Sequence, residues 1–451
     1  MYEIITPNSP YYNSTRLIWN RSIERYPDSI AYCISYSDVQ EAILFARNCK
    51  REIRIRSGGH NYEGFCIADQ AFVIDISGLN EMHINYSKNT VTVQGGVINA
   101  QLYNFLAVRG YPFPGGTCPT VSISGFTLGG GWGYTARYYG LGCDNLLECK
   151  MVDYNGRLLT ANETTNPALF WALRGAGSGN FGVVVEFTFR LPPKVENVTL
   201  FEIYYPNQSK EQQINFLTTW QSFISKATNR INMNGGIYNT AEDGIYSYLR
   251  GLFLGTKEDL DNVLTPFSAL PDYTLATRYT SFLEAMNQIF STYPPKEYFK
   301  SGGRFVTTNL SKQSIQNLVD ILWKERPNGS YLTSINVFGL GGRVKDIPID
   351  ETAFYFRYSN YILQTQSVFE DNLYRRENIN FVINNYHYIE SITSGSYINF
   401  PFTPLKDYML SYYGPHAYRL IYVKHRYDPY NVFHYEQSIP ESPYCNPNNF
   451  I

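Results

Sequence analysis

Residues 53–66 read IRIRSGGHNYEGFC. The first four alternate apolar and basic side chains, which is typical of a β-strand. A strand that ends in Ser-Gly-Gly exposes successive backbone N–H groups with no Cβ in the way, and such a nest can bind a phosphate. His60 would then project beside a bound cofactor. For this stretch alone, a tight turn with a surface histidine is the more ordinary interpretation.

A second glycine-rich stretch strengthens the cofactor interpretation. Between Gly115 and Gly133 the chain reads GGTCPTVSISGFTLGGGWG and holds seven glycines, with a thiol at Cys118. That glycine content predicts a loop that packs closely against another group, rather than a helix or a strand. Two glycine-rich paths would therefore carry a histidine and a cysteine to one ligand.

A third stretch, GSGNFG at 177–182, has the GxGxxG spacing of dinucleotide-binding loops. That fingerprint requires a strand before it and a helix after it. Here we expect a helix before it, in PALFWALRG, and a strand after it, in FGVVVEFTFRL, so a Rossmann site is improbable. HExxH, Gly-x-Ser-x-Gly and GKS/GKT motifs do not occur in the sequence, and we predict no metal.

The composition points to a soluble protein that binds a small molecule. The 451 residues suggest two to three domains, and a net charge of −2 shows no bias toward nucleic acid or membranes. No secretory signal or apolar run of about 18 residues is visible, so we expect a cytoplasmic chain; a longer, secreted precursor stays open. The seven cysteines, including Cys445, have irregular spacing and predict neither a disulfide framework nor a zinc site.

The periodicity of apolar residues predicts two regions that differ in how helices and strands follow one another. The first third alternates helix and strand, with a helix to about Asn48 and a hairpin turning at Asn155-Gly156. Leu191-Pro-Pro-Lys194 is a plausible boundary. Strand-like and helix-like runs beyond it suggest an α+β domain with an antiparallel sheet. The C-terminal helix closes at Asp428-Pro429, and the sequence pattern does not say which domain it joins.

Six motifs together resemble the berberine-bridge-enzyme-like FAD-linked oxidases of the vanillyl-alcohol-oxidase superfamily. They are RSGGHNYEG (56–64), PGGTCPTVSISGFTLGGGWG (114–133), DNLLECKMVDYNGRLLT (144–160), FWALRGAGSGNFGVV (170–184), SYINF (396–400) and YDPYNVFHYEQSIP (427–440). The resemblance implies a two-domain α+β fold of that superfamily. The FAD-binding domain would comprise residues 1–194 and 405–451, and the substrate-binding domain residues 195–404.

The resemblance also implies a flavin with two covalent bonds. His60 would bind the 8α-methyl group and Cys118 would bind C6, which fixes the ring in an open site and raises its reduction potential. Further motif residues would hold the same FAD: Arg56, Ser57, Gly58, Gly59, Asn61, Gly116, Thr117, Ser122, Gly125, Gly131, Gly177, Gly179, Asn180, Gly182 and Asn431.

For the chemistry, the family's Tyr-x-Asn motif places Tyr397 beside the flavin N5 as the candidate base. A free tyrosine has a pKa of about 10, so a positive or hydrogen-bonding neighbour must assist it. Tyr62 would line the pocket and orient the substrate. Trp132 replaces a tyrosine found in many relatives and cannot supply an acidic hydroxyl. Gln364 and Gln366 are candidate substrate-side residues, in a stretch whose register the resemblance does not fix.

Val121 bears on what reoxidises the flavin. The third residue after the linking cysteine stands near C4a in this family, where dioxygen approaches, and valine there tends to accompany oxidases. A larger aliphatic side chain would close a small cavity in a packed wall. We therefore expect O2 as the acceptor and H2O2 as a product, with a quinone as the alternative.

The predicted reaction is oxidation of an alcohol or hemiacetal carbon in a sugar, oligosaccharide, or glycosylated or polycyclic metabolite. Two alternatives stay open. One is a biosynthetic flavoenzyme that performs oxidative cyclisation or dehydrogenation of a secondary metabolite. The other is a flavin-binding protein without turnover. The identity of the substrate cannot be read from the sequence.

Overall fold

The computed structural model describes residues 2–442, and Cys445 lies outside them. The N-terminal residues form a four-stranded sheet in the order β1-β2-β4-β3, in which only β1 runs antiparallel to its neighbour. Helix α2 (Tyr36–Asn48) begins at a capping box of Ser35 and Asp38, and its apolar face is buried. The strands are β1 (Glu3–Ile5), β2 (Ser29–Tyr32), β3 (Ile53–Arg56) and β4 (Phe72–Asp75).

A five-stranded antiparallel sheet follows, in the order β5-β6-β9-β7-β8. Asn155 and Gly156 turn the hairpin between β7 and β8, as predicted, and Gly156 has a φ of 72°. The strands are β5 (Met82–Asn85), β6 (Thr90–Gln94), β7 (Leu146–Val152), β8 (Leu158–Asn162) and β9 (Val183–Arg190).

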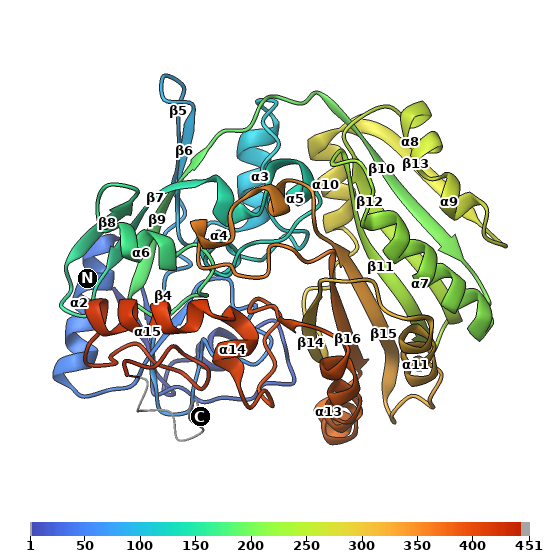
Figure 1. Ribbon diagram of the computed structural model, residues 1–451. Coiled ribbons are helices and arrows are strands. Elements are labelled where there is room, and N and C mark those ends of the chain that lie inside the picture. Colours follow the sequence, from blue (N-terminus) through green and yellow to red (C-terminus); the bar gives the residue numbers. More distant parts are fainter. Residues whose placement is uncertain (1, 443–451) are drawn as a thin grey trace.

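The middle of the chain builds an eight-stranded antiparallel sheet in the order β13-β10-β12-β11-β15-β16-β14-β17, which confirms the predicted α+β class (Figure 1). Several of its strands, β11, β13, β14 and β16 among them, were not identified from the sequence. The strands are β10 (Asn197–Tyr205), β11 (Ile231–Thr240), β12 (Gly244–Phe253), β13 (Thr274–Ser281), β14 (Tyr298–Val306), β15 (Ser330–Gly339), β16 (Tyr361–Phe369) and β17 (Gly395–Ser396).

This large sheet has one apolar and one polar face, because side chains two residues apart on a strand share a face. Leu249, Val337 and Leu363 lie in the apolar core on one side, where α7 (Lys210–Ile224) and α11 (Lys312–Leu322) also pack. The neighbouring positions put polar side chains on the other face, toward the two smaller sheets: Asn234, Arg250, Ser334, Asn336, Gln364 and Gln366. The sheet therefore presents a polar wall to the N-terminal part of the chain.

The remaining helices connect or cover these sheets. The α-helices are α1 (Tyr12–Thr15), α3 (Asn99–Ala107), α4 (Ile123–Leu128), α5 (Ala136–Tyr139), α6 (Pro167–Ala172), α8 (Lys257–Val263), α9 (Thr265–Ser268), α10 (Phe282–Phe290), α12 (Arg343–Asp346), α13 (Arg375–Ser391), α14 (Tyr408–Tyr413) and α15 (His416–Tyr427). Three short 3-10 helices cover Gly142–Asn145, Ile349–Glu351 and Asn372–Tyr374.

The glycine-rich stretch from Gly115 to Gly133 is not loop throughout, so that expectation was wrong in part. Its centre forms α4, whose N-terminus is capped by the Ser122 side chain accepting from the Ser124 amide. Phe126 and Leu128 are buried in the core. Capping and apolar burial therefore outweigh the single glycine inside this helix.

The last described helices return to the N-terminal part of the molecule (Figure 1). The Tyr413 hydroxyl donates to the carbonyl of Ala176 at 2.8 Å, and Lys424 Nζ donates to the carbonyl of Asn180 at 2.7 Å. Lys424 is itself fully buried in an ion pair with Asp428. This arrangement fits the proposed division at residues 194 and 404, which stays a prediction.

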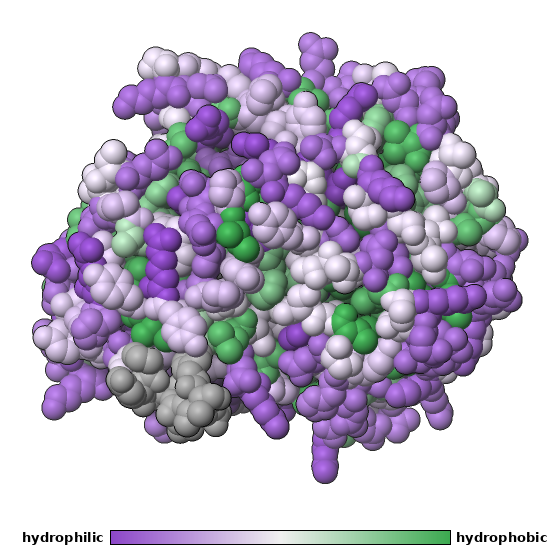
Figure 2. All heavy atoms as spheres, in the orientation of Figure 1, coloured by the Kyte–Doolittle hydropathy of each residue, from purple (hydrophilic) through white to green (hydrophobic). Residues whose placement is uncertain are grey.

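The surface shows a mixture of polar and apolar side chains, with hydrophilic ones covering most of the face in Figure 2. Among residues 2–442, no helix combines the length and apolar character needed to cross a membrane. The same residues contain no cluster of three or more His, Cys, Asp or Glu side chains that could hold a metal ion.

Candidate active site

A cavity of about 540 Å³ lies between the glycine-rich segments and the polar wall of the large sheet. Its lining includes residues 57–62 on one side and residues 116–118, 121–122 and 124–126 on another. Residues of strands β11, β12, β15 and β16 lie opposite. A concave site of this size is typical of a small-molecule or cofactor pocket. Both halves of the chain therefore contribute to one binding site.

Two glycines show why this wall is rich in glycine. A Cβ on Gly58 would lie 2.7 Å from the amide nitrogen of Ser122, so only glycine allows the two segments to approach this closely. A Cβ on Gly125 would meet nothing within 4 Å, because this residue faces the open cavity. The first glycine joins the two segments, and the second leaves room for a ligand against the backbone.

The same wall offers hydrogen-bond donors. Within residues 2–442, the amides of Gly58, Gly59, His60 and Asn61 donate to no backbone or side-chain acceptor, although these residues line the cavity. Consecutive free N–H groups form a nest that suits a phosphate or a ring carbonyl. These donors fit FAD, whose pyrophosphate and isoalloxazine ring both need them.

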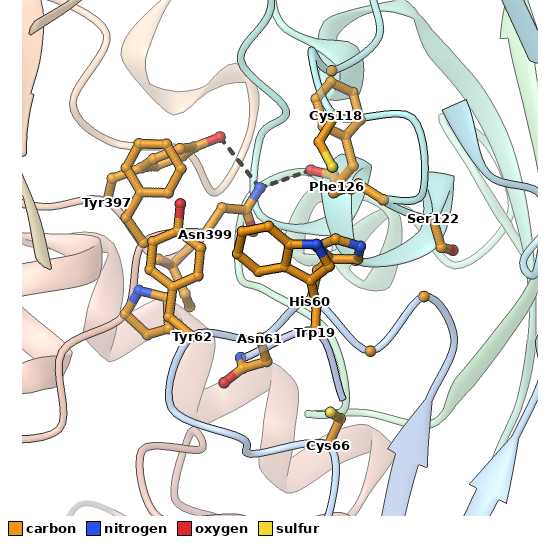
Figure 3. A pocket seen from close by; sticks show the side chains of 18 of the residues that line it. Trp19, His60, Asn61, Tyr62, Cys66, Cys118, Ser122, Phe126, Tyr397 and Asn399 are labelled. Atoms are coloured by element: carbon orange, nitrogen blue, oxygen red, sulfur yellow. Dashed lines mark hydrogen bonds between the residues drawn. The ribbon is translucent and has the colours of Figure 1, made fainter. Parts of the chain in front are cut away.

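His60 stands at the edge of this nest. Its Nε2 lies 2.8 Å from the hydroxyl oxygen of Thr120, and its ring stacks on Trp19 with centroids 5.3 Å apart (Figure 3). Burial lowers the pKa of His60 to about 4. The imidazole is therefore neutral near pH 7, and Thr120 engages Nε2 while Nδ1 has no partner among the described residues.

Cys118 contacts the same hydroxyl. Its Sγ lies 3.8 Å from Thr120 Oγ1, and Asn99 Nδ2 donates to the carbonyl of Cys118 at 2.9 Å. Burial raises the pKa of the Cys118 thiol. The structure thus brings together the histidine and the cysteine that the sequence singled out, because both contact the hydroxyl of one threonine.

Tyr397 lies in another part of the same cavity wall and is 2% exposed. Its hydroxyl oxygen accepts from the backbone amides of Gly131 and Trp132, at 3.2 and 3.1 Å, and from Asn399 Nδ2 at 3.2 Å (Figure 3). A neutral phenol oxygen has two lone pairs, so three donors suit a phenolate better. Burial raises the pKa of Tyr397 to about 12, and these three donors act in the opposite direction.

Trp132 and Val121 also line the cavity. Trp132 Nε1 donates to the carbonyl of Gly339 at 2.6 Å, so the indole joins the glycine-rich segment to the large sheet. Its only hydrogen-bonding atom is a donor, and it cannot accept a proton. Val121 is partly buried, and its carbonyl accepts from the amide of Asn99.

Tyr62 faces the polar wall. Its ring stacks on the ring of Phe400, with the ring centroids 5.3 Å apart and an angle of 3° between the ring planes. Gln364 Nε2 donates to the Tyr62 hydroxyl at 3.4 Å. Gln364 and Gln366 point to the same face of β16, and both carboxamide oxygens lie near Asn336 Nδ2. The structure thus places both glutamines in the cavity wall and resolves the register that the sequence left open.

Other predicted cofactor residues lie outside the cavity lining. Arg56 forms a buried ion pair with Asp75 at 2.6 Å, and Asn180 accepts from the amide of Ile439 at 2.9 Å. The amide of Gly131 donates its hydrogen bond to the Tyr397 hydroxyl oxygen and not to a cofactor. The side chains of these residues shape the surrounding structure, and their direct contact with the cofactor stays a prediction, as it does for Gly182 and Asn431.

Sequence reasoning missed several residues of the site. Trp19 comes from a segment without any motif, and Glu297 and Arg250 come from strands or turns of the middle region. Thr120 and Asn399 lie inside motifs that were recognised, in PGGTCPT and SYINF. Thr120 lies two positions after Cys118, and Asn399 lies two positions after Tyr397. Their polar side chains, so close to the predicted site residues, could have indicated both.

Comparisons with known proteins agree with this geometry. Residues 27–162 match a family model described as FAD binding domain, and residues 396–440 match one described as Berberine and berberine like. The uncharacterized FAD-linked oxidoreductase YgaK of Bacillus subtilis is 32% identical over 446 residues, covering 97% of this chain and 96% of that protein.

Two solved structures share the fold along almost the whole chain. Xylooligosaccharide oxidase from Myceliophthora thermophila, in complex with xylobiose, is 25% identical with a TM-score of 0.87, and 97% of each chain is covered. Glucooligosaccharide oxidase from Acremonium strictum, whose FAD is 6-S-cysteinyl and 8α-N1-histidyl, is 22% identical with a TM-score of 0.90, and 98% of this chain and 97% of that chain are covered.

Proposed function

Because this chain belongs to the berberine-bridge-enzyme-like family of FAD-linked oxidoreductases, we propose that it carries FAD bound to both His60 and Cys118 and oxidises a carbohydrate. One observation carries the proposal: both side chains contact Thr120 in the cavity that also contains Tyr397. The two linkages in the Acremonium oxidase support the same pair of attachments here.

The neutral state of His60 favours the attachment. Imidazole attacks carbon only through an unprotonated nitrogen, and the lowered pKa of His60 keeps the ring unprotonated. Since Thr120 engages Nε2, Nδ1 is the nitrogen left to form the bond. The stacked Trp19 ring holds the imidazole in this orientation.

Bound FAD would accept a hydride from the substrate carbon and pass the electrons to dioxygen. The chain's own contribution is proton transfer: the Tyr397 oxygen takes the proton of the substrate hydroxyl. Before this transfer, the amides of Gly131 and Trp132 and the Asn399 carboxamide stabilise Tyr397 as the phenolate that acts as the base, as donors in an oxyanion hole do. The transfer leaves Tyr397 as a neutral phenol and the substrate as an alkoxide, which can release its hydride. Hydrogen-bonding neighbours therefore supply the assistance that the sequence required.

The substrate would lie between the flavin and the polar wall. Carboxamides of Asn336, Gln364 and Gln366 can bind sugar hydroxyls, and the flat faces of Tyr62 and Tyr238 can stack on sugar rings. The xylobiose complex of the Myceliophthora oxidase supports an oligosaccharide as the substrate class. We further propose O2 as the acceptor, with H2O2 as the product, on the basis of Val121 in the cavity wall.

Anaerobic mixing with a substrate panel tests this function. We expect oligosaccharides with a free hemiacetal end to bleach the flavin absorbance, and admission of air to restore it with formation of H2O2. Bleaching by alkaloid-like or polyketide-like compounds alone would favour biosynthetic oxidation. If no compound bleaches the flavin, and Tyr397→Phe changes nothing, the chain binds flavin without turnover.

A further inference from the structure

Arg250 is a buried cation in the wall of the active-site cavity. It lies on β12 within the polar face of the large sheet and is 8% exposed. Its Nε donates to the Tyr134 hydroxyl at 3.2 Å, and its Nη1 donates to the Thr292 hydroxyl at 2.8 Å. Both acceptors are neutral. Among residues 2–442, Arg250 forms no ion pair, and its Nη2 has no hydrogen-bond acceptor.

The charges of the other six buried arginines of the described chain are compensated within the protein. Five of them pair with carboxylates: Arg54 with Glu52 and Glu436, Arg56 with Asp75, Arg174 with Glu351, Arg304 with Glu390, and Arg357 with Asp144. Arg137 instead donates to four backbone carbonyls, those of Ile224, Ala227, Ile231 and Leu340. Arg250 differs from the five because no carboxylate pairs with it, and from Arg137 because only two hydroxyl oxygens accept from it.

Neither the cross-strand carboxylate nor the carboxylate in the cavity wall neutralises Arg250. Glu202 lies directly opposite on β10, but its Oε1 accepts from the Tyr248 hydroxyl at 2.6 Å and forms no ion pair with Arg250. Glu297 also lines the cavity and likewise forms no ion pair with it. Since a guanidinium stays charged and its burial is costly without an anion, an anion from outside the chain would complete this site.

We propose that Arg250 binds a carboxylate of the substrate, so that the sugar is a uronic acid or contains one. This inference rests on the proposed function and narrows its substrate class. The guanidinium fork matches carboxylate geometry. Tyr238 provides a flat ring in the same wall, on which the sugar ring can lie. The Tyr238 ring itself stacks on Tyr246, with the ring centroids 5.0 Å apart and an angle of 11° between the ring planes. The carboxylate then fixes the sugar and leaves its hemiacetal carbon free for oxidation.

Digalacturonate and galactobiose of the same linkage make a matched test, because they differ only in the carboxylates. Calorimetric titration of the flavin-loaded protein should show tighter binding of digalacturonate, weakened by added salt. Arg250→Gln should weaken that binding roughly 10- to 100-fold, the effect of one charge-assisted hydrogen bond, and leave galactobiose unchanged. Arg250→Lys should retain part of the binding.

Controls separate this role from a structural one. Arg278→Gln removes the same charge from an exposed position on β13 and should leave binding unchanged. Covalent flavin content and melting temperature of Arg250→Lys should match the native protein. If both Arg250 variants lose flavin, the arginine supports the cofactor and the inference is wrong.

Other outcomes also decide it. The inference would be overturned if the two disaccharides bound equally well, or if Arg250→Gln bound digalacturonate as tightly as the native protein. Binding of a sulfated galactobiose in place of digalacturonate would also overturn it. Neutral sugars could still bleach the flavin in that case, and the oxidase function would stand. Conversely, if digalacturonate binds through Arg250 and neither it nor any neutral sugar bleaches the flavin, the anion site is upheld and the oxidase function is refuted.

Discussion

The hydroxyl oxygen of Thr120 lies 2.8 Å from Nε2 of His60. The same oxygen lies 3.8 Å from the sulfur of Cys118, so one side chain positions both groups proposed to hold the flavin. Contact with Nε2 leaves Nδ1 as the nitrogen that can bond to the cofactor. Thr120 is therefore a positioning residue whose effect should be visible in the pattern of covalent attachment.

Thr120→Val should slow the histidyl attachment more than the cysteinyl attachment. Valine keeps the branched shape and removes the hydroxyl that orients the imidazole. Peptide mapping after digestion would reveal flavin on the Cys118 peptide and a reduced amount on the His60 peptide. Thr120→Ser keeps the hydroxyl and serves as the control; equal attachment in the valine and serine variants would refute the positioning role.

Tyr397→Phe should slow flavin bleaching by substrate about 10²- to 10⁴-fold, the usual contribution of a general base. The variant removes the oxygen that accepts from Gly131, Trp132 and Asn399 but keeps the ring in its buried place. Stopped-flow absorbance under anaerobic conditions measures the rate. Flavin content should be unchanged, and a bleaching rate equal to that of the native protein would exclude Tyr397 as the base.

Val121→Leu should slow reoxidation of the bleached flavin roughly tenfold or more. The added methylene would fill space in a packed wall of the cavity, where dioxygen must approach. Mixing bleached protein with oxygenated buffer gives the rate, and Val121→Ala is the matched control that enlarges the space. Slow reoxidation of the native protein, or no slowing in the leucine variant, would point to a quinone or another acceptor.

Glu297 should make stability depend on pH. Burial raises the pKa of its carboxyl from 4.5 to about 7. Between these values the unfolded chain has lost the proton that the folded chain retains, so stability falls as pH rises from 4.5 to 7 and then levels off. The loss amounts to at most about 3 kcal/mol.

Glu297→Gln should remove this pH dependence, while Glu163→Gln, at an exposed position, should keep it. Urea unfolding of the flavin-loaded protein at a series of pH values gives the free energies. Identical pH profiles for the native protein and Glu297→Gln would show that the carboxyl is not shielded from water.

Local motifs predicted much of the site. The Ser-Gly-Gly end of β3, the Asn155-Gly156 turn and the strand that follows GSGNFG are short-range features, and each has the predicted form in the structure. The cofactor class and the oxidoreductase activity followed from combining such motifs. Residues of one motif fold together, so their chemistry is visible before the fold is known.

Long-range pairing was not visible in the same way. The order of the eight-stranded sheet depends on contacts between distant segments, and only that order puts Arg250 and Gln364 in the same wall as His60. Helix α4 escaped prediction because its burial outweighs its glycine content. Trp19 has no motif of its own, and only tertiary structure places its ring on His60.

Bicovalent attachment of FAD is the central claim, and the intact mass of the acid-denatured protein tests it most directly. The native chain should gain the mass of one FAD, and His60→Ala and Cys118→Ala should each retain that gain through the remaining bond. The double variant should show the mass of the unmodified chain and release its flavin into the supernatant. A native chain at its unmodified mass, with all flavin in the supernatant, would contradict the account.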